Sequence, residues 1–82
     1  MNDIDTRLLR IFLVLMSERS VSMTADRMGL SQPAVSHALT RLRQVFGDPL
    51  LLRSRAGMTP TNRALSLEEP VREVLGGYER LV

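Results

Sequence analysis

Apolar residues recur at helical spacing in the first part of the chain. The first stripe consists of Leu8, Phe12, Leu15 and Met16, at steps of four, three and one. This period predicts an amphipathic helix that begins near Asp3 or Asp5 and ends over residues 18–20. Either aspartate can cap the amides of the first turn, and the sequence leaves both open.

Serine and glycine mark the boundaries of the next two predicted helices. Ser22 is expected to cap a short second helix, and Gly29 is a natural left-handed residue at its end. Ser31 is expected to cap a third helix that runs to about Phe46, where residues 47–49 close it. The apolar stripe of this third helix consists of Val35, Leu39, Leu42, Val45 and Phe46.

A short hairpin and a fourth helix are expected next. Residues 50–53 are a strand candidate, residues 54–57 supply a turn, and residues 58–59 form the returning strand. Pro60 breaks the chain, and Thr61 can cap a fourth helix. The pattern therefore predicts a mainly α fold with a three-helix core, a short two-stranded hairpin and a long carboxy-terminal helix.

The fourth helix carries an apolar seam. Its members alternate at steps of three and four, the spacing of a coiled-coil stripe, and they are Ala64, Leu67, Val71, Val74, Tyr78 and Leu81. Such a stripe either pairs with a second copy of the chain or packs onto the first helix. Pro70 is expected to kink or interrupt this helix, and Gly76 and Gly77 are expected to weaken its last turns.

The composition limits the possible chemistry. The 82 residues fit one domain, and they include no cysteine and one histidine, so disulfides and the usual zinc sites are not expected. The longest apolar run, Ile11–Met16, is far shorter than the roughly 20 residues that cross a bilayer. Asp3 and Asp5 stand where a signal peptide needs cations. We expect no membrane contact, no metal and no cofactor for this chain.

Positive charge is concentrated in the middle of the chain, although the total is only +2. Residues 1–36 carry four arginines and four acidic residues, and residues 64–82 carry two arginines against four glutamates. Residues 37–63 carry five arginines against one aspartate, a net charge of +4. A basic segment between a neutral and an acidic one suggests an anion-binding face.

The second and third helices have the spacing of a helix-turn-helix. Ala25 is small where the two helices cross, and Gly29 accepts a positive φ in the turn. The second and third helices are expected to pack onto the first helix through Met28, Leu30 and Val35. The opposite side of the third helix is small, polar and cationic, which suits insertion into the major groove of DNA. This outer side consists of Pro33, Ser36, His37, Thr40, Arg41 and Gln44.

The residue types of this outer side match the edges of bases. Gln32 can pair with an adenine, and Ser36 or His37 can donate to or accept from a neighbouring base. Pro33 and Thr40 offer apolar surface to a thymine methyl group. An ordinary solvated helix face is the alternative, and the preceding short helix with its glycine turn favours DNA.

Four arginines are candidates for contacts outside the bases. Arg41 and Arg43 flank the outer side of the third helix and are expected to reach phosphates. Arg53 and Arg55 fall two residues apart in the hairpin, so both can point to one side of a strand. A phosphate or minor-groove contact follows for this pair. Two ordinary surface arginines are the alternative.

Two other classes of function fit the sequence less well. A helical protein-interaction module would have the same topology, and the polar outer side of the third helix argues against it. An enzyme would need a catalytic constellation. His37 directly follows Ser36, and adjacent helix residues diverge by about 100°, so the two cannot act as base and nucleophile. We expect no enzymatic activity.

These segments together resemble a known family. Residues 22–42, SMTADRMGLSQPAVSHALTRL, look like the amino-terminal winged helix-turn-helix of LysR-type transcriptional regulators. Residues 46–53, FGDPLLLR, and residues 57–61, GMTPT, resemble the family's wing and the start of its linker helix. The similarity covers essentially the whole chain, and it extends to the branch with regulators of aromatic catabolism and nodulation.

The resemblance implies a winged helix-turn-helix DNA-binding domain over residues 1–60, with the helix-turn-helix at about 21–40 and the wing at about 50–59. A linker and dimerisation helix follows over residues 61–82. Family members are bacterial, cytoplasmic and DNA-associated regulators that bind interrupted palindromic promoter sites in double-stranded DNA. They act as dimers through the fourth helix and usually assemble as tetramers.

The resemblance also implies which residues contact DNA and that the family's effector-binding domain lies outside this chain. It carries DNA contacts over to Gln32, Pro33, Ser36, His37 and Arg53, and phosphate contacts to Ser22 and Ser31 at helix starts. The position of Arg43 is often acidic in the family, so its partners are expected to differ here. The family's effector-binding domain is absent from this chain. We therefore expect a fragment of a longer regulator whose small-molecule effector binds only in that missing domain.

Overall fold

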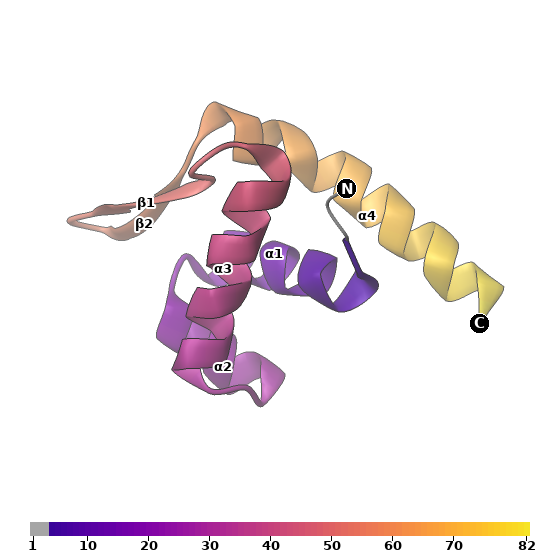
Figure 1. Cartoon of the computed structure of the whole chain (residues 1–82), viewed down its shortest axis with the longest axis horizontal. Helices are drawn as coiled ribbons and strands as arrows, with labels where there is room; N and C mark the ends of the chain where they lie inside the picture. The colour runs from indigo at the N-terminus through magenta and orange to yellow at the C-terminus, as the bar shows by residue number, and fades with distance from the viewer. Residues whose placement is uncertain (1–3) are drawn as a thin grey trace.

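The computed structural model describes residues 4–82, which contain four helices and a two-stranded sheet. In chain order the elements are α1 (Thr6–Glu18), α2 (Val21–Met28), α3 (Gln32–Phe46), β1 (Leu51–Ser54), β2 (Gly57–Pro60) and α4 (Asn62–Leu81). Helices α1, α2 and α3 gather together, the β1–β2 hairpin projects to one side, and α4 extends to the other with the C-terminus at its end (Figure 1). The predicted winged helix-turn-helix with a long last helix is confirmed.

Helix α1 buries one continuous apolar side. Its cap is Asp5, whose carboxylate accepts a hydrogen bond from the Leu8 N–H at 2.7 Å. The other candidate cap, Asp3, lies outside the described residues. The buried residues of α1 are Leu8, Leu9, Ile11, Phe12, Leu15 and Met16. As expected for residues 18–20, the helix ends at Arg19, which is left-handed with a φ of 56°.

The cap of α2 differs from the prediction. Ser20 caps the helix, not Ser22: its backbone is extended and its hydroxyl accepts from the Met23 N–H at 3.1 Å. Because Arg19 already turns the chain, Ser20 takes the capping position. Ser22 lies in the first helical turn, where its hydroxyl is 3.1 Å from that of Ser20. Helix α2 ends as predicted at Gly29, which has a φ of 67°.

Helix α3 has its predicted bounds. Ser31 caps it by accepting from the Ala34 N–H at 3.2 Å, and Pro33 lies in the first turn. The stripe that faces inward is buried at Val35, Ala38, Leu39 and Leu42 and only half-buried at Val45 and Phe46. The four buried residues belong to one core cluster with Phe12 and Leu15 of α1.

The hairpin forms where the sequence predicts it, but its turn is placed differently. Strands β1 and β2 are antiparallel, and β1 ends at Ser54. Arg55 therefore lies in the turn and not on the strand. The expectation that Arg53 and Arg55 point to the same side of one strand is wrong for this reason. The hairpin is attached to the helices through β2, because the Met58 N–H donates to the Arg19 carbonyl at 3.2 Å.

Pro70 does not interrupt α4, contrary to the prediction, and the two glycines of its last turns remain helical. A proline inside a helix removes one hydrogen bond of the ladder. Val71 and Leu75, which follow it, are buried in the core with 4% and 5% of their surface exposed, and this packing offsets the loss. Thr61 caps α4 as predicted, by accepting from the N–H three residues later at 3.1 Å.

We predict that Ser20→Ala lowers the free energy of unfolding by about 0.5–2 kcal/mol, because it removes the cap of α2. Ser22→Ala is the matched control and should change the free energy by less than about 0.5 kcal/mol, as surface substitutions usually do. Urea denaturation measures both. A larger loss for Ser22→Ala would contradict the assignment of the cap.

Gly29 offers a clean test of the turn between α2 and α3. A Cβ added there would meet no heavy atom within 4 Å, so a substitution tests the backbone conformation alone. Gly29→Val should cost about 1–3 kcal/mol, since a β-branched residue is strained at positive φ. Gly29→Asn should cost less, because asparagine tolerates the left-handed region. Equal thermal stability of the two variants would be inconsistent with this account.

Candidate nucleic-acid interface

The outward side of α3 is accessible along its length. All five residues predicted to contact bases are exposed, and we call them the reading face: Gln32, Pro33, Ser36, His37 and Thr40. The opposite side of the helix is buried at Val35, Leu39 and Leu42. Burial of that side fixes the rotation of α3 about its own axis, so the reading face points away from the protein.

Two hydroxyl groups of α3 already have partners within the chain. Thr40 Oγ1 donates to the Ser36 carbonyl at 3.2 Å, which leaves the methyl group as the part of Thr40 best suited to contact a base. The Ser31 hydroxyl oxygen accepts from the Ala34 N–H as the helix cap. Its proton is not used by that bond, so Ser31 can still donate to a phosphate.

Most of the predicted phosphate contacts lie on exposed surface. Arg41 is exposed on α3, Arg53 is exposed on β1, and Arg55 is exposed in the turn of the hairpin. Ser22 is exposed in the first turn of α2. The exposed arginines therefore stand on two separate elements, α3 and the hairpin.

Arg43 differs from the other predicted phosphate contacts, because it binds within the chain. Its half-buried side chain is bound to the backbone: Nε donates to the Pro49 carbonyl at 2.8 Å, and Nη2 donates to the Leu51 carbonyl at 2.7 Å. Two N–H groups of the guanidinium are thus occupied by backbone carbonyls between α3 and β1.

Asp48 is a structural residue that the sequence analysis did not single out. Its Oδ2 accepts from the Leu50 N–H at 2.8 Å and from Thr61 Oγ1 at 2.7 Å. One carboxylate oxygen therefore joins the residue before β1 to the cap of α4. Aspartate in a turn bounded by glycine and proline is a known signal for side-chain bonds to the backbone, although the bond to Thr61 spans 13 residues.

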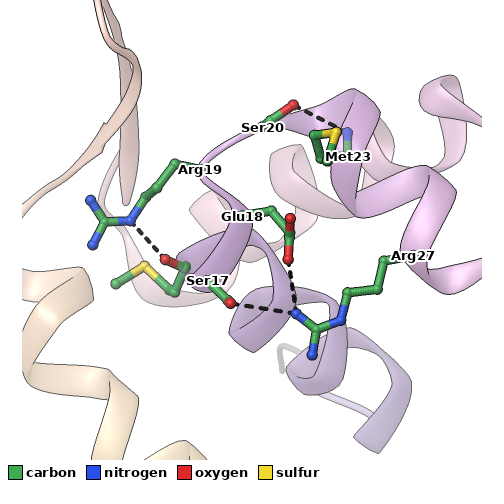
Figure 2. A network of polar contacts seen from close by, with 7 residues as sticks. Ser17, Glu18, Arg19, Ser20, Met23 and Arg27 are labelled. Atoms are coloured by element: carbon green, nitrogen blue, oxygen red, sulfur yellow. Dashed lines mark hydrogen bonds and ion pairs between the residues drawn. The ribbon is translucent and has the colours of Figure 1, made fainter.

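A second polar cluster joins α1 to α2 (Figure 2). Arg27 Nη1 lies 3.0 Å from Glu18 Oε2 and 3.4 Å from Ser17 Oγ, and Arg19 Nε donates to the Met16 carbonyl at 2.7 Å. An exposed ion pair of this kind contributes about 0–1 kcal/mol. The cluster lies at the junction of the helices that support α3, not on the reading face.

A groove of about 520 Å³ separates the first turns of α1 from α3 beside the reading face. Its lining includes Leu8, Ile11, Leu30, Ala34, His37 and Arg41. Within residues 4–82 no cluster of three or more His, Asp or Glu side chains is arranged to hold a metal ion. No helix in this part of the chain is long and apolar enough to cross a membrane.

The predicted seam of α4 is divided by the fold. Ala64 and Val71 are buried in the core of the same chain, and Leu67 packs against that core. Val74, Tyr78 and Leu81 remain exposed, with 56%, 40% and 85% of their surface accessible. The guanidinium of Arg10 lies 5.9 Å from the centre of the Tyr78 ring. Packing onto α1 thus accounts for the first half of the seam, and only the second half is available to a partner.

A short helix, a glycine turn and a helix with an exposed polar side, flanked by a hairpin that carries arginines, define a winged helix-turn-helix of the nucleic-acid-binding class. The family described as "Bacterial regulatory helix-turn-helix protein, lysR family" matches residues 6–65. The chain therefore belongs to the lysR family, as the DNA-binding domain of a transcriptional regulator.

Relatives of known identity agree with this assignment. The chain is 49% identical over 75 residues to the HTH-type transcriptional regulator PhcA of Ralstonia nicotianae, covering 92% of this chain and 22% of that protein. It is 48% identical over 75 residues to the HTH-type transcriptional activator NahR of Pseudomonas putida, covering 92% and 25% respectively. The chain thus spans about a quarter of the length of the curated relatives it matches.

Solved structures share the fold. A probable transcriptional regulator from Pseudomonas aeruginosa, PA0477, superposes with a TM-score of 0.84 at 39% identity, over 94% of this chain and 26% of that one. The DNA-binding domain of CbnR, solved as a complex with DNA, superposes with a TM-score of 0.87 at 26% identity, over 94% of this chain and 88% of that one.

Proposed function

We propose that this chain reads a specific sequence in double-stranded DNA by placing α3 in the major groove. The observation that carries the proposal is the reading face, which is exposed along α3 while the opposite side of the same helix is buried. An α-helix fits the width of the major groove, where each base pair has a distinct pattern of donors and acceptors. The CbnR domain that resembles this chain was itself solved with DNA, which supports the proposal.

Different residues of the reading face are suited to different groups on the bases. Gln32, the first residue of α3, carries an amide whose Oε1 can accept from the N6 amino group of adenine while its Nε2 donates to N7, the bidentate pairing that glutamine makes with adenine. Ser36 and His37 each offer hydrogen bonds of both kinds. Pro33 and the methyl group of Thr40 supply apolar contact for a thymine methyl group.

Phosphate contacts would hold α3 in register without reading the sequence. Arg41 on α3 and Arg53 and Arg55 on the hairpin are exposed cations of the basic segment 37–63 that we assign to phosphates. Ser22 and Ser31 lie at the starts of α2 and α3, where the helix dipole and the backbone amides favour an anion. Arg43 is left out of this set, because its guanidinium already donates to two backbone carbonyls of the connection to β1.

We infer that the chain binds DNA as a dimer through the exposed half of the α4 seam. Val74, Tyr78 and Leu81 would otherwise leave an apolar stripe in water. A groove of about 360 Å³ with an almost wholly apolar lining, which includes Leu9 and Leu67, adjoins Val74. A two-fold pair of α3 helices about 34 Å apart would match the two halves of an interrupted palindrome. Assembly into a tetramer and an effector site belong to the longer regulator that the family implies.

The base-reading role of Gln32 is tested with the duplex that the protein selects from a random pool. Gln32→Ala should cost about 1–3 kcal/mol on that duplex and relax the preference at one base pair, because a bidentate contact is lost. Gln44→Ala is the matched control, an exposed glutamine at the other end of α3, and should leave the preference unchanged. An equal loss on every duplex for Gln32→Ala would remove Gln32 from base reading.

The role of the hairpin is tested by the dependence of affinity on salt. Arg53→Ala should weaken binding to selected and scrambled duplexes alike and flatten the slope of log K against log salt by about 0.9, the value for one lost phosphate contact. Equal affinity of the wild type for selected and scrambled duplexes would leave only nonspecific binding.

The dimer is tested by sedimentation velocity over a range of protein concentrations. Val74→Glu and Leu81→Glu should each shift the population toward monomer, because they place a charge in the apolar stripe. Leu65→Glu is the control: Leu65 is 48% exposed on α4 but lies outside the seam. A wild-type chain that sediments only as a monomer at high concentration would reject the dimer.

A further inference from the structure

The connection between α3 and the hairpin contains a strained turn. Leu50 is fully buried and has a φ of 64°, which residues with a side chain rarely adopt. The Leu51 N–H donates to the Pro49 carbonyl at 2.7 Å, the hydrogen bond of a γ-turn centred on Leu50. The form of this turn with positive φ is the rare and strained one, so contacts from its surroundings must hold it.

Arg43 supplies contacts on both sides of that turn. From its place on α3 it donates Nε to the Pro49 carbonyl and Nη2 to the Leu51 carbonyl, at 2.8 Å and 2.7 Å. The guanidinium is planar and rigid, so two bonds from one group fix the direction of the chain between these carbonyls. Leu51 is the first residue of β1, so the Nη2 bond joins the start of the strand to α3.

Asp48 also binds the turn at Leu50. Its carboxylate accepts from the Leu50 N–H and from Thr61, the cap of α4. The Thr61 N–H in turn donates to the Leu50 carbonyl at 2.9 Å. The turn at Leu50 is thus the point at which α3, the hairpin and α4 are bound together.

We propose that Arg43 is a positioning residue for DNA binding, which sets the hairpin relative to α3 so that Arg53 reaches a phosphate while α3 lies in the major groove. Arg53 lies on β1 two residues after Leu51, so a change in the direction of the strand displaces it. Arg43 itself does not touch DNA. This inference rests on the proposed function, because it requires that the hairpin contact DNA.

A double-mutant cycle on DNA affinity tests the proposal with the duplex selected from a random pool. Arg43→Met should weaken binding about as much as Arg53→Ala and flatten the salt slope by about 0.9, since the contact of Arg53 is lost. In the Arg53→Ala background, Arg43→Met should add less than about twofold, the usual scatter between independent sites. Arg41→Met is the matched control, whose effect should be the same in both backgrounds.

The double-mutant cycle distinguishes a positioning role of Arg43 from a direct contact with DNA and from a loss of folded protein. A direct phosphate contact by Arg43, or a general loss of folded protein, would weaken binding equally with and without Arg53. An equal loss in both backgrounds, measured with variants that are folded, would overturn the proposal. Circular dichroism melts of each variant establish that the protein is folded at the temperature of the assay. If Arg43→Met fails to fold, Arg43→Lys replaces it, because lysine keeps the charge but lacks the planar fork.

A distance measurement tests the positioning without DNA. The sequence has no cysteine, so spin labels on Gln44→Cys and Ala56→Cys report the separation of α3 and the tip of the hairpin alone. We expect a narrow distance distribution in the otherwise wild-type protein and a broader or shifted one with Arg43→Met or Arg43→Lys. An unchanged distribution would refute the positioning role, whereas a wild type that binds no duplex would refute the proposed function and leave this measurement intact.

Discussion

The burial of one side of α3 is the constraint on which the rest of the molecule depends. Val35, Leu39 and Leu42 belong to the same core cluster as Phe12 and Leu15 of α1, and four of these five side chains are fully inaccessible. This packing leaves α3 no freedom to rotate about its axis. Polar residues on the opposite side are therefore presented outward by hydrophobic burial, with no need for bonds of their own to the protein.

The other elements preserve the orientation that this burial creates. Gly29 turns the chain between α2 and α3 through its positive φ, and Ser31 caps the first turn of α3. Asp48 and Arg43 then bind the end of α3 to the hairpin and to α4. Recognition of a duplex would thus use a rigid unit in which helix and hairpin keep a fixed relation. Rigid presentation lowers the entropy that binding must overcome.

Features encoded by short-range chemistry were predictable from the sequence. Ser31, Gly29 and Thr61 each act within one helical turn of their own position, and the structure uses them as predicted. The predicted cap Ser22 was wrong by two positions, because the left-handed Arg19 turns the chain directly before Ser20. The reading face followed from helical period alone, because one apolar stripe determines which residues remain outside.

Features that depend on distant partners were not predictable. The guanidinium of Arg43 is bound by carbonyls six and eight residues away, and no local pattern distinguishes it from the exposed Arg41. The α4 seam has a uniform period, yet packing onto the core buries its first half and exposes its second. Continuity of α4 through Pro70 likewise depends on the burial of Val71 and Leu75, which is a tertiary effect.

A backbone amide NMR titration of the nitrogen-labelled protein with its selected duplex shows which side of α3 meets the DNA. The largest shift changes should fall in two groups, residues 32–41 on the outward side of α3 and residues 53–55 in the hairpin. Changes confined to α1 and the far end of α4, with α3 unaffected by the duplex, would be incompatible with recognition through the outward side of α3.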